Sequence, residues 1–555
     1  MKSRYICMFA CLWGLGFLFS CDGFLNENPK DKIPEEDAYK NLTDLYYNAV
    51  ASLYNNIGGY SDSQGLQGTG RGIYDLNTFT TDEAIMPTRG GDWYDGGFWQ
   101  GLFLHRWGVD NDAIQATWEY LYKVVSLCNQ SLERIDTYQQ THNDEELPVY
   151  RAEVCAFRAL YYYHLMDLFA RVPLVLSSST PLKEVKQNSR KEVFDFVVKE
   201  LQESEPLLET AYSNRSGNYY GRITRPVACF LLAKLALNAE IYTDNNWTDG
   251  QFPDGKDIYF EVDGERLNAW QTVEAYCDAI TAMGYRLEDN YEANFAVYNE
   301  SSVENIFTIP MSKTLYTNQM QYLFRSRHYN HAKAYGLGGE NGSSATVEVL
   351  RTFGYDTEAV DPRFDKCYFA GIVYDLKGKV VTLDDGTELE YFPWKVDVDI
   401  SNTPYEKTAG ARMKKYAIDE TATKDGKLME NDIVLYRYAD VLLMKSEAKV
   451  RNGENGDEEL NLVRSRVNAP FRTATLANLL AERQLEFAWE GWRRQDLIRF
   501  RQYTRTYTGR PQLSGEKNGY TTVFPIPEKV RLMNPNLTQN PGYLSLIHIS
   551  EPTRP

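Results

Sequence analysis

Apolar side chains recur at three- and four-residue spacing through the first half of the chain, which is the pattern of helices with one buried face. The clearest stripe predicts a helix over about residues 114–135, and it consists of Ile114, Trp118, Leu121, Tyr122, Val125, Cys128, Leu132 and Ile135. The same spacing predicts further helices at about 37–55, 147–169, 191–208, 226–242 and 269–283. Short polar breaks separate them, so the pattern favours antiparallel helix hairpins of the tetratricopeptide type, stacked without a regular repeat length.

The helical pattern stops between residues 285 and 430, where glycine, asparagine, tyrosine and charged residues follow one another without a sustained period. Within this stretch, residues 303–309 predict a strand, and residues 377–389 predict a hairpin because Asp-Asp-Gly lies between apolar runs. Residues 58–100 are rich in Gly, Asp and Thr and predict irregular structure. Helical patterns return at 433–451, 458–467 and 475–500.

The predicted fold class is mostly α-helical, a tetratricopeptide-like helical-hairpin scaffold with a large irregular, loop-rich region and few short strands. We expect one domain over residues 36–543, made of a scaffold at about 36–283 and 431–503 and an insertion at about 285–430. The last residues, 544–555, do not continue the pattern and resemble translated sequencing-adapter contamination. We interpret them as a non-native tail and exclude them from the argument.

The N-terminus has the layout of a secretion signal. Lys2 and Arg4 precede an uncharged apolar run, residues 6–19, which is short for a membrane span. Ser20 and Cys21 at its end resemble the processing box of bacterial lipoproteins, which implies removal of residues 1–20 and lipid attachment at Cys21. Residues 21–35 would then form a tether from the lipid to the domain. The alternative is an ordinary signal peptide with an incidental cysteine.

Charge and cysteine usage exclude several classes of function. The formal net charge of −18 at pH 7 argues against a nucleic-acid partner, because phosphate contacts need clustered Lys and Arg. The widely spaced cysteines after Cys21 form no CxxC pair and fall mostly in apolar helical patterns, which indicates buried free thiols; they are Cys128, Cys155, Cys229, Cys277 and Cys367. The sequence contains no phosphate-binding loop and no zinc or nucleophile motif, so we predict neither cofactor nor metal.

Four segments point to one protein family. They are Arg151 to Leu165 with 169–173, Leu435 to Ala448, Glu482 to Leu497, and Phe524-Pro-Ile-Pro527 followed by 534–541. Together they resemble the SusD/RagB family of outer-membrane glycan-binding lipoproteins of Bacteroidetes, and the resemblance covers residues 21–543. It implies a non-catalytic, lipid-anchored protein exposed at the outer-membrane surface. It also implies an oligosaccharide ligand, or a peptide in some relatives, and a SusC-like TonB-dependent transporter that this protein covers as a lid.

Carboxylates recur every four residues in the third of these segments, at Glu482, Glu486 and Glu490, with Arg483 and Arg493 nearby. A carboxylate pair for glycoside hydrolysis is one interpretation of this pattern. We favour an ion-paired helix face beside an apolar core, so structure rather than a ligand explains these residues.

Sugar rings combine flat C–H faces with hydroxyl edges, so a binding site needs exposed aromatic rings and polar groups. The segment 89–99 concentrates both between paired glycines, and its candidate contacts are Arg89, Asp92, Trp93, Tyr94, Asp95 and Trp99. The alternative is that Trp93 and Trp99 plug the underside of the loop. A second group in the insertion contains Tyr316, Tyr322, His328, Tyr329, His331 and Asn341, for which aromatic contacts are favoured over a metal site at the histidines.

Two rival functions remain open from the sequence. One is a surface glycosidase that uses Asp92, Asp95 or Glu83, and the other is an assembly scaffold that binds protein or peptide through its helix hairpins. The sequence does not identify the glycan, because ligand choice depends on loop geometry.

Overall fold

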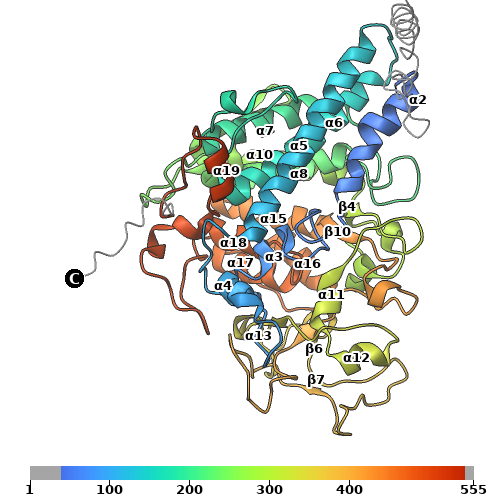
Figure 1. Cartoon of the computed structure of the whole chain (residues 1–555), viewed down its shortest axis with the longest axis vertical. Helices are drawn as coiled ribbons and strands as arrows, with labels where there is room; N and C mark the ends of the chain where they lie inside the picture. Colours follow the sequence, from blue (N-terminus) through green and yellow to red (C-terminus); the bar gives the residue numbers. More distant parts are fainter. Residues whose placement is uncertain (1–38, 544–555) are drawn as a thin grey trace, which may run out of the picture. The chain divides into compact units, whose positions relative to one another are not determined.

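The computed structural model describes residues 39–543 and is about 45% helical with few short strands (Figure 1). The predicted signal peptide, the lipid-attachment Cys21, the tether and the C-terminal tail lie outside the described residues. The first described helix, α2 (Leu42–Leu45), begins at Asn41, whose side chain accepts the N–H of Asp44. It belongs to a compact unit that ends at Asn48, and the elements described below belong to a second unit that begins at Ala49.

Helices form the scaffold, as the apolar spacing predicts, and all but the four-residue α9 have ten residues or more. They are α5 (Asp112–Gln139), α6 (Leu147–Phe169), α7 (Arg190–Ser204), α8 (Arg225–Leu237), α9 (Ala239–Tyr242), α10 (Ala269–Ala282), α15 (Tyr438–Asn452) and α16 (Asp457–Arg466). Helix α5 packs on α6 and α6 on α7, while α10 packs on both α8 and α15. This succession of paired helices confirms the tetratricopeptide-like scaffold.

Local capping explains where several of these helices begin. Asn111 accepts the N–H groups of Ala113 and Ile114 at the start of α5. Ser189 and Glu192 form a reciprocal capping box at the start of α7, so the N–H groups of these two residues are satisfied.

Two predicted helices in the C-terminal part of the chain differ from the structure. The first five residues of the predicted helix 433–451 form a strand, β10 (Ile433–Arg437), which pairs antiparallel with β4 (Asn305–Ile309). Every residue of both strands is buried, and a short, mostly apolar run such as 433–436 does not distinguish a buried strand from a helix turn. The predicted strand at 303–309 is confirmed as β4.

The predicted helix 475–500 is broken into α17 (Leu476–Glu486) and α18 (Arg493–Arg499). Trp489 and Gly491 adopt left-handed backbone conformations in the break, with φ of 65° and 74°. The carbonyl of Glu486, which a continuing helix would bond to the N–H of residue 490, instead accepts hydrogen bonds from Tyr291, Lys415 and Arg437. Side chains from elsewhere therefore replace the helical hydrogen bond at this point.

The glutamates of this segment lie in a buried ion-pair network rather than on a solvated helix face. Arg437 binds Glu486 at 2.6 Å and Glu490 at 2.8 Å, and Lys415 binds Glu490 at 2.6 Å. We use the name buried ion-pair network for Glu304, Arg363, Lys415, Arg437, Arg464, Arg466, Glu482, Glu486 and Glu490. The prediction that structure rather than a ligand explains these glutamates agrees with this arrangement.

The segment 58–100 contains more regular structure than predicted, namely α3 (Ile73–Thr78), β1 (Ala84–Ile85) and α4 (Phe98–Phe103). Two short strands, β2 (Tyr259–Val262) and β3 (Glu265–Asn268), precede α10, and α19 (Glu528–Met533) lies near the C-terminus. The insertion contains the other short elements, which are α11 (Gln321–Ser326), α12 (Tyr329–Ala334), β5 (Ser344–Ala345), α13 (Val347–Phe353), α14 (Phe364–Cys367), β6 (Tyr368–Phe369), β7 (Gly371–Ile372), β8 (Glu390–Tyr391) and β9 (Arg412–Met413). The strands form five separate two-stranded antiparallel ladders among the described residues.

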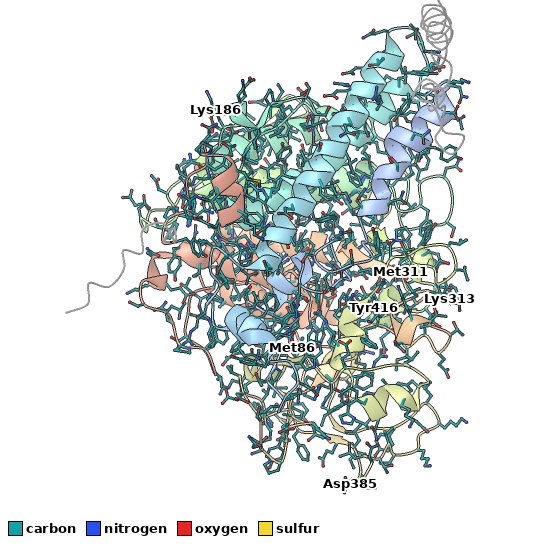
Figure 2. The ribbon with its side chains drawn as sticks, in the orientation of Figure 1. Met86, Lys186, Met311, Lys313, Asp385 and Tyr416 are labelled. Atoms are coloured by element: carbon teal, nitrogen blue, oxygen red, sulfur yellow. The ribbon has the colours of Figure 1, made fainter. Side chains whose placement is uncertain are left out.

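The predicted hairpin at 377–389 is present and gains a third segment. Backbone bridges join Tyr374 to Val380 and Thr382 to Glu388, and β7 pairs with β8 beside them. The tip of this hairpin, including Asp385, is exposed, whereas Met86, Met311 and Tyr416 are buried in the interior (Figure 2).

Candidate functional site

The pairing of β1 with β5 brings the two predicted ligand regions together, because β1 precedes the loop 89–99 and β5 follows residues 321–342. The loop turns sharply at its start: the N–H of Arg89 bonds the carbonyl of Asp92, and the N–H of Asp92 bonds the carbonyl of Arg89. Gly90 makes this turn possible with a φ of 65°. Loop 89–99 and helix α12 therefore meet, and a hydrogen bond between Tyr329 and Asp92 joins them.

Trp93 is half-buried and held in place by both regions. Its indole N–H donates to the carbonyl of Glu340 at 2.9 Å, and its ring packs closely on Gly342 and edge-on against Trp99 at 5.9 Å. Its φ of 62° is a conformation that costs a non-glycine residue about 1–3 kcal/mol. These contacts offset that cost and fix the ring in one orientation.

Tyr94 follows Trp93 in the loop and Tyr329 reaches the loop from helix α12, and these two residues are 58% and 45% exposed. The Tyr329 hydroxyl donates to Asp92 Oδ2 at 3.2 Å, which ties helix α12 to the loop. Burial and the neighbouring Asp92 raise the pKa of Tyr329, so its hydroxyl stays protonated at neutral pH. We call Trp93, Tyr94 and Tyr329 the aromatic face.

Charged groups border the aromatic face. Asp95 pairs with Arg71 at 2.7 Å, and the Arg71 guanidinium lies 5.0 Å from the centre of the Phe98 ring. Both partners of the ion pair keep more than a third of their side-chain area in solvent. They can therefore exchange part of their mutual bonding for hydroxyl groups of a ligand.

Four of the predicted contact residues are buried beneath this face. Trp99 is 2% exposed and packs against Phe79 and Phe98, with its indole N–H donating to Asp95. The Arg89 guanidinium donates hydrogen bonds to the Ser344 hydroxyl and to the carbonyls of Gly342, Glu406 and Ala409. Because these groups are already enclosed, they shape the face from below.

Tyr322 and Asn341 are the other two buried candidates. Tyr322 stacks on Tyr74 with ring centres 4.2 Å apart. Asn341 lies in a left-handed backbone conformation where residues 340–342 run against residues 324–327, and its N–H donates to the carbonyl of Arg327. Neither side chain reaches solvent in this structure, which differs from the predicted surface contacts.

The histidines of the second candidate group are also enclosed. His331 Nδ1 lies 2.9 Å from the Tyr391 hydroxyl, and burial lowers the pKa of His328 to about 4. Over residues 39–543, no group of three or more His, Cys, Asp or Glu side chains is placed to hold a metal ion. Tyr316, in contrast, is 40% exposed.

Sequence reasoning missed Glu340, which lies at the edge of the aromatic face. Burial raises its pKa, Lys427 and Arg325 oppose this effect, and Asp62 and Asp425 add to it. Acidic and basic side chains from separate loops therefore gather where the Glu340 carbonyl holds Trp93. The only signal in the sequence was the position of Glu340 next to the Asn341 that the motif Gly-Gly-Glu-Asn-Gly singled out.

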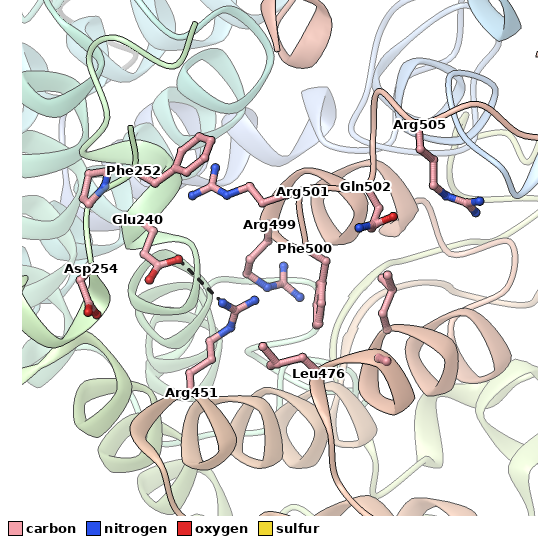
Figure 3. Close-up of a pocket in the computed structure, with 13 residues that line it drawn as sticks. Glu240, Phe252, Asp254, Arg451, Leu476, Arg499, Phe500, Arg501, Gln502 and Arg505 are labelled. Atoms are coloured by element: carbon pink, nitrogen blue, oxygen red, sulfur yellow. Dashed lines mark ion pairs between the residues drawn. The ribbon is translucent and has the colours of Figure 1, made fainter. Parts of the chain in front are cut away.

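A cavity of about 810 Å³ is lined by elements that do not form the aromatic face, namely α9, α15, α17 and the chain after α18 (Figure 3). Arg451 extends from α15 toward Glu240 at 3.7 Å, and Arg501 lies over the Phe252 ring at 3.7 Å. None of the residues predicted to contact a ligand lines this cavity.

No helix within residues 39–543 has both the length and the apolar character needed to cross a membrane.

Comparison with known proteins assigns the chain to a family. A model of the SusD family matches residues 303–543, and a model described as "Starch-binding associating with outer membrane" matches residues 24–237. The starch-binding protein SusD of Bacteroides thetaiotaomicron is 25% identical over 86% of this chain and 87% of its own length. A SusD-like protein of Formosa agariphila is 24% identical over 95% of this chain and 97% of its own length.

Solved structures share the fold. A laminarin-binding SusD-like protein superposes with a TM-score of 0.66 at 21% identity, covering 91% of this chain and 100% of that protein. Surface glycan-binding protein A of Bacteroides thetaiotaomicron, solved with laminarihexaose, gives a TM-score of 0.67 at 19% identity, covering 90% and 99%. With two family models matching most of its length and the scaffold shared with these structures, the chain belongs to the SusD family.

Proposed function

We propose that this protein captures oligosaccharides on the aromatic face and delivers them to a SusC-like TonB-dependent transporter, as a lipid-anchored protein of the outer-membrane surface. The observation that carries the proposal is the convergence of Trp93, Tyr94 and Tyr329 from two separate segments. The relatives support the ligand class, since one is a starch-binding protein and one was solved with laminarihexaose.

The chemistry of the aromatic face suits a neutral sugar. Aromatic rings contribute about 0.5–1.5 kcal/mol each when a partner stacks on them, and carbohydrate C–H faces present such a surface. Asp92, Asp95 and Arg71 offer acceptors and donors for the hydroxyl edges. Because hydroxyl desolvation offsets much of each contact, we expect a weak site whose strength grows with chain length.

The rival glycosidase needs a pair of carboxylates that reach the substrate. Glu83, one of its three candidates, is 1% exposed and accepts the backbone N–H of Trp489 beneath the surface. Asp92 and Asp95 remain at the face, where Tyr329 and Arg71 engage them. We therefore assign these two carboxylates to hydroxyl recognition in a protein that breaks no bond.

Isothermal titration against a panel of oligosaccharides tests the proposal. The panel includes starch- and laminarin-derived chains, and the variant is Tyr94→Ala combined with Tyr329→Ala. Removing two stacking rings should weaken binding by about tenfold to a hundredfold. The melting temperature should change little, because both side chains are largely exposed and the Tyr329–Asp92 hydrogen bond lies at the surface. Phe471→Ala, at an aromatic residue that is 70% exposed elsewhere, is the matched control.

Equal binding by the double variant and by wild type would move the ligand site away from the aromatic face. Hydrolysis of any panel member would favour the glycosidase. Failure of wild type to bind any glycan would favour the protein- or peptide-binding scaffold.

A further inference from the structure

A second, smaller pocket adjoins the cavity of Figure 3 and shares no lining residue with the aromatic face. Its volume is about 140 Å³, and Phe252 and Arg501 line both spaces. Figure 3 shows Arg501 directed toward Phe252, so these two side chains form the boundary between them. We call this space the Arg190 pocket, lined among others by Arg190, Asp244, Trp247, Phe252, Arg501 and Lys517.

Three side chains of the Arg190 pocket carry buried polar atoms that the protein leaves unsatisfied. Within residues 39–543, Arg190 Nε and Nη1, Asp244 Oδ2 and Trp247 Nε1 have no hydrogen-bond partner. Arg190 is 1% exposed, and no described carboxylate lies within ion-pair distance of its guanidinium. An unpaired buried charge destabilises the folded state, and most buried polar groups in folded proteins are paired. These donors and this acceptor are therefore available to form hydrogen bonds with a bound small molecule, called the guest below.

The charges of the Arg190 pocket define that guest. Arg190, Arg501 and Lys517 are cationic, and Asp244 is the one carboxylate in the lining. Burial lowers the pKa of Arg190 to about 10, which leaves the guanidinium protonated at neutral pH. The excess of cations favours an anion. The unpartnered oxygen of Asp244 needs a donor on the same guest and disfavours a multiply charged anion.

The size of the pocket agrees with a small organic molecule. One buried water needs about 10–15 Å³, so about 140 Å³ holds a guest of several non-hydrogen atoms. We propose that the Arg190 pocket binds a small carboxylic acid that also carries a hydroxyl or amino group. Its carboxylate binds Arg190 and the Trp247 indole N–H, Arg501 lies at the entrance from the larger cavity, and the hydroxyl or amino group donates to Asp244 Oδ2. This site is independent of glycan capture at the aromatic face.

Titration calorimetry with three probes of similar size tests the assignment. Glycerate has both the carboxylate and the hydroxyl groups, glycerol lacks the charge, and inorganic phosphate carries a larger charge. We expect glycerate to bind at millimolar concentration or below and to raise the melting temperature, with glycerol and phosphate binding more weakly.

Two substitutions locate the binding. Arg501→Gln removes an exposed cation, and Trp247→Phe removes one unpartnered N–H. Trp247→Phe should weaken glycerate binding by about tenfold, the usual worth of a hydrogen bond to a charged group. Arg501→Gln should also weaken it, because the substitution removes a positive charge at the entrance of the pocket. Arg106→Gln, at an exposed arginine that does not line the pocket, is the control for loss of charge. Trp489→Phe, at a buried indole N–H that is also unpartnered, is the control for loss of the indole.

Three results would overturn the proposal. They are the absence of glycerate binding to wild type, glycerol or phosphate binding as tightly as glycerate, and an unchanged affinity in both pocket variants. Retained binding in the two controls with loss in the two pocket variants would support it.

Discussion

Gly342 lies where the Trp93 ring meets the chain, so one added methyl group there tests how the aromatic face is held. A Cβ at this position would come 2.7 Å from both Trp93 Cε2 and Met86 Sδ, and contacts below 3.0 Å force a shift. The backbone of Gly342 is outside the left-handed region, so the substitution adds no backbone strain. Overpacking of this kind costs about 1–3 kcal/mol, and we expect Gly342→Ala to lower the free energy of unfolding by that amount.

The displaced Trp93 ring should also weaken glycan binding, although no group that touches the ligand is removed. Chemical denaturation measures the stability, and titration calorimetry measures the affinity. Gly101→Ala in α4 is the matched control, because its Cβ would meet only the Arg106 carbonyl at 3.6 Å. A helical Gly→Ala change should stabilise the protein by about 0.5–1 kcal/mol. If Gly342→Ala is as stable as wild type, the close packing of Trp93 on Gly342 is refuted.

Further predictions concern the interior. Burial alone would raise the pKa of Glu486, but the pKa is held well below its usual range by Arg466, Arg437 and Arg363. Glu486→Gln should therefore lower the free energy of unfolding by about 3–5 kcal/mol. A smaller effect than that of a solvent-exposed Glu→Gln control would contradict this prediction. Burial raises the pKa of Asp432 to about 7, so the folded state keeps a proton that the unfolded state releases. This contribution to stability is present below about pH 4 and is lost as the pH rises to about 7, and Asp432→Asn should flatten that part of the stability profile. Burial raises the pKa of Cys155 to about 11, so a disulfide reagent at neutral pH should modify Cys155 slowly in the native protein and rapidly after unfolding; fast native labelling would contradict the burial.

The scaffold was largely predictable because its helices carry local signals. Helix α6 begins and ends at the predicted residues 147 and 169, where Pro148 in the first turn and Pro173 beyond the end agree with the apolar pattern. The secondary-structure predictions are wrong where residues distant in sequence determine the local backbone conformation. Strand β10 exists because β4 lies beside it, and the break after α17 exists because Lys415 and Arg437 take the Glu486 carbonyl. Neither partner is visible in a local window of sequence.

The candidate site was predictable as a region but not residue by residue. Clustered aromatic residues between glycines indicated loop 89–99, and the structure adds Tyr329 from the second predicted group. Composition could not separate the exposed Tyr94 from the buried Trp99, because both lie in one short aromatic run. Glu340 was missed since its place beside Trp93 depends on a backbone contact across the fold.

The buried ion-pair network limits which parts of this protein can vary independently. Arg363 and Lys415 come from the insertion, whereas Glu482 and Glu486 come from α17 and Glu490 from the break that follows it. Replacing the whole insertion with that of a distant relative would leave several buried charges without their ion-pair partners. Exchanges confined to loop 89–99 or to the exposed hairpin around Asp385 would leave every one of these pairs intact. Under the proposed function, ligand preference can therefore change through these surface loops, whereas substitutions at the junction between the insertion and the C-terminal segment have to be made together.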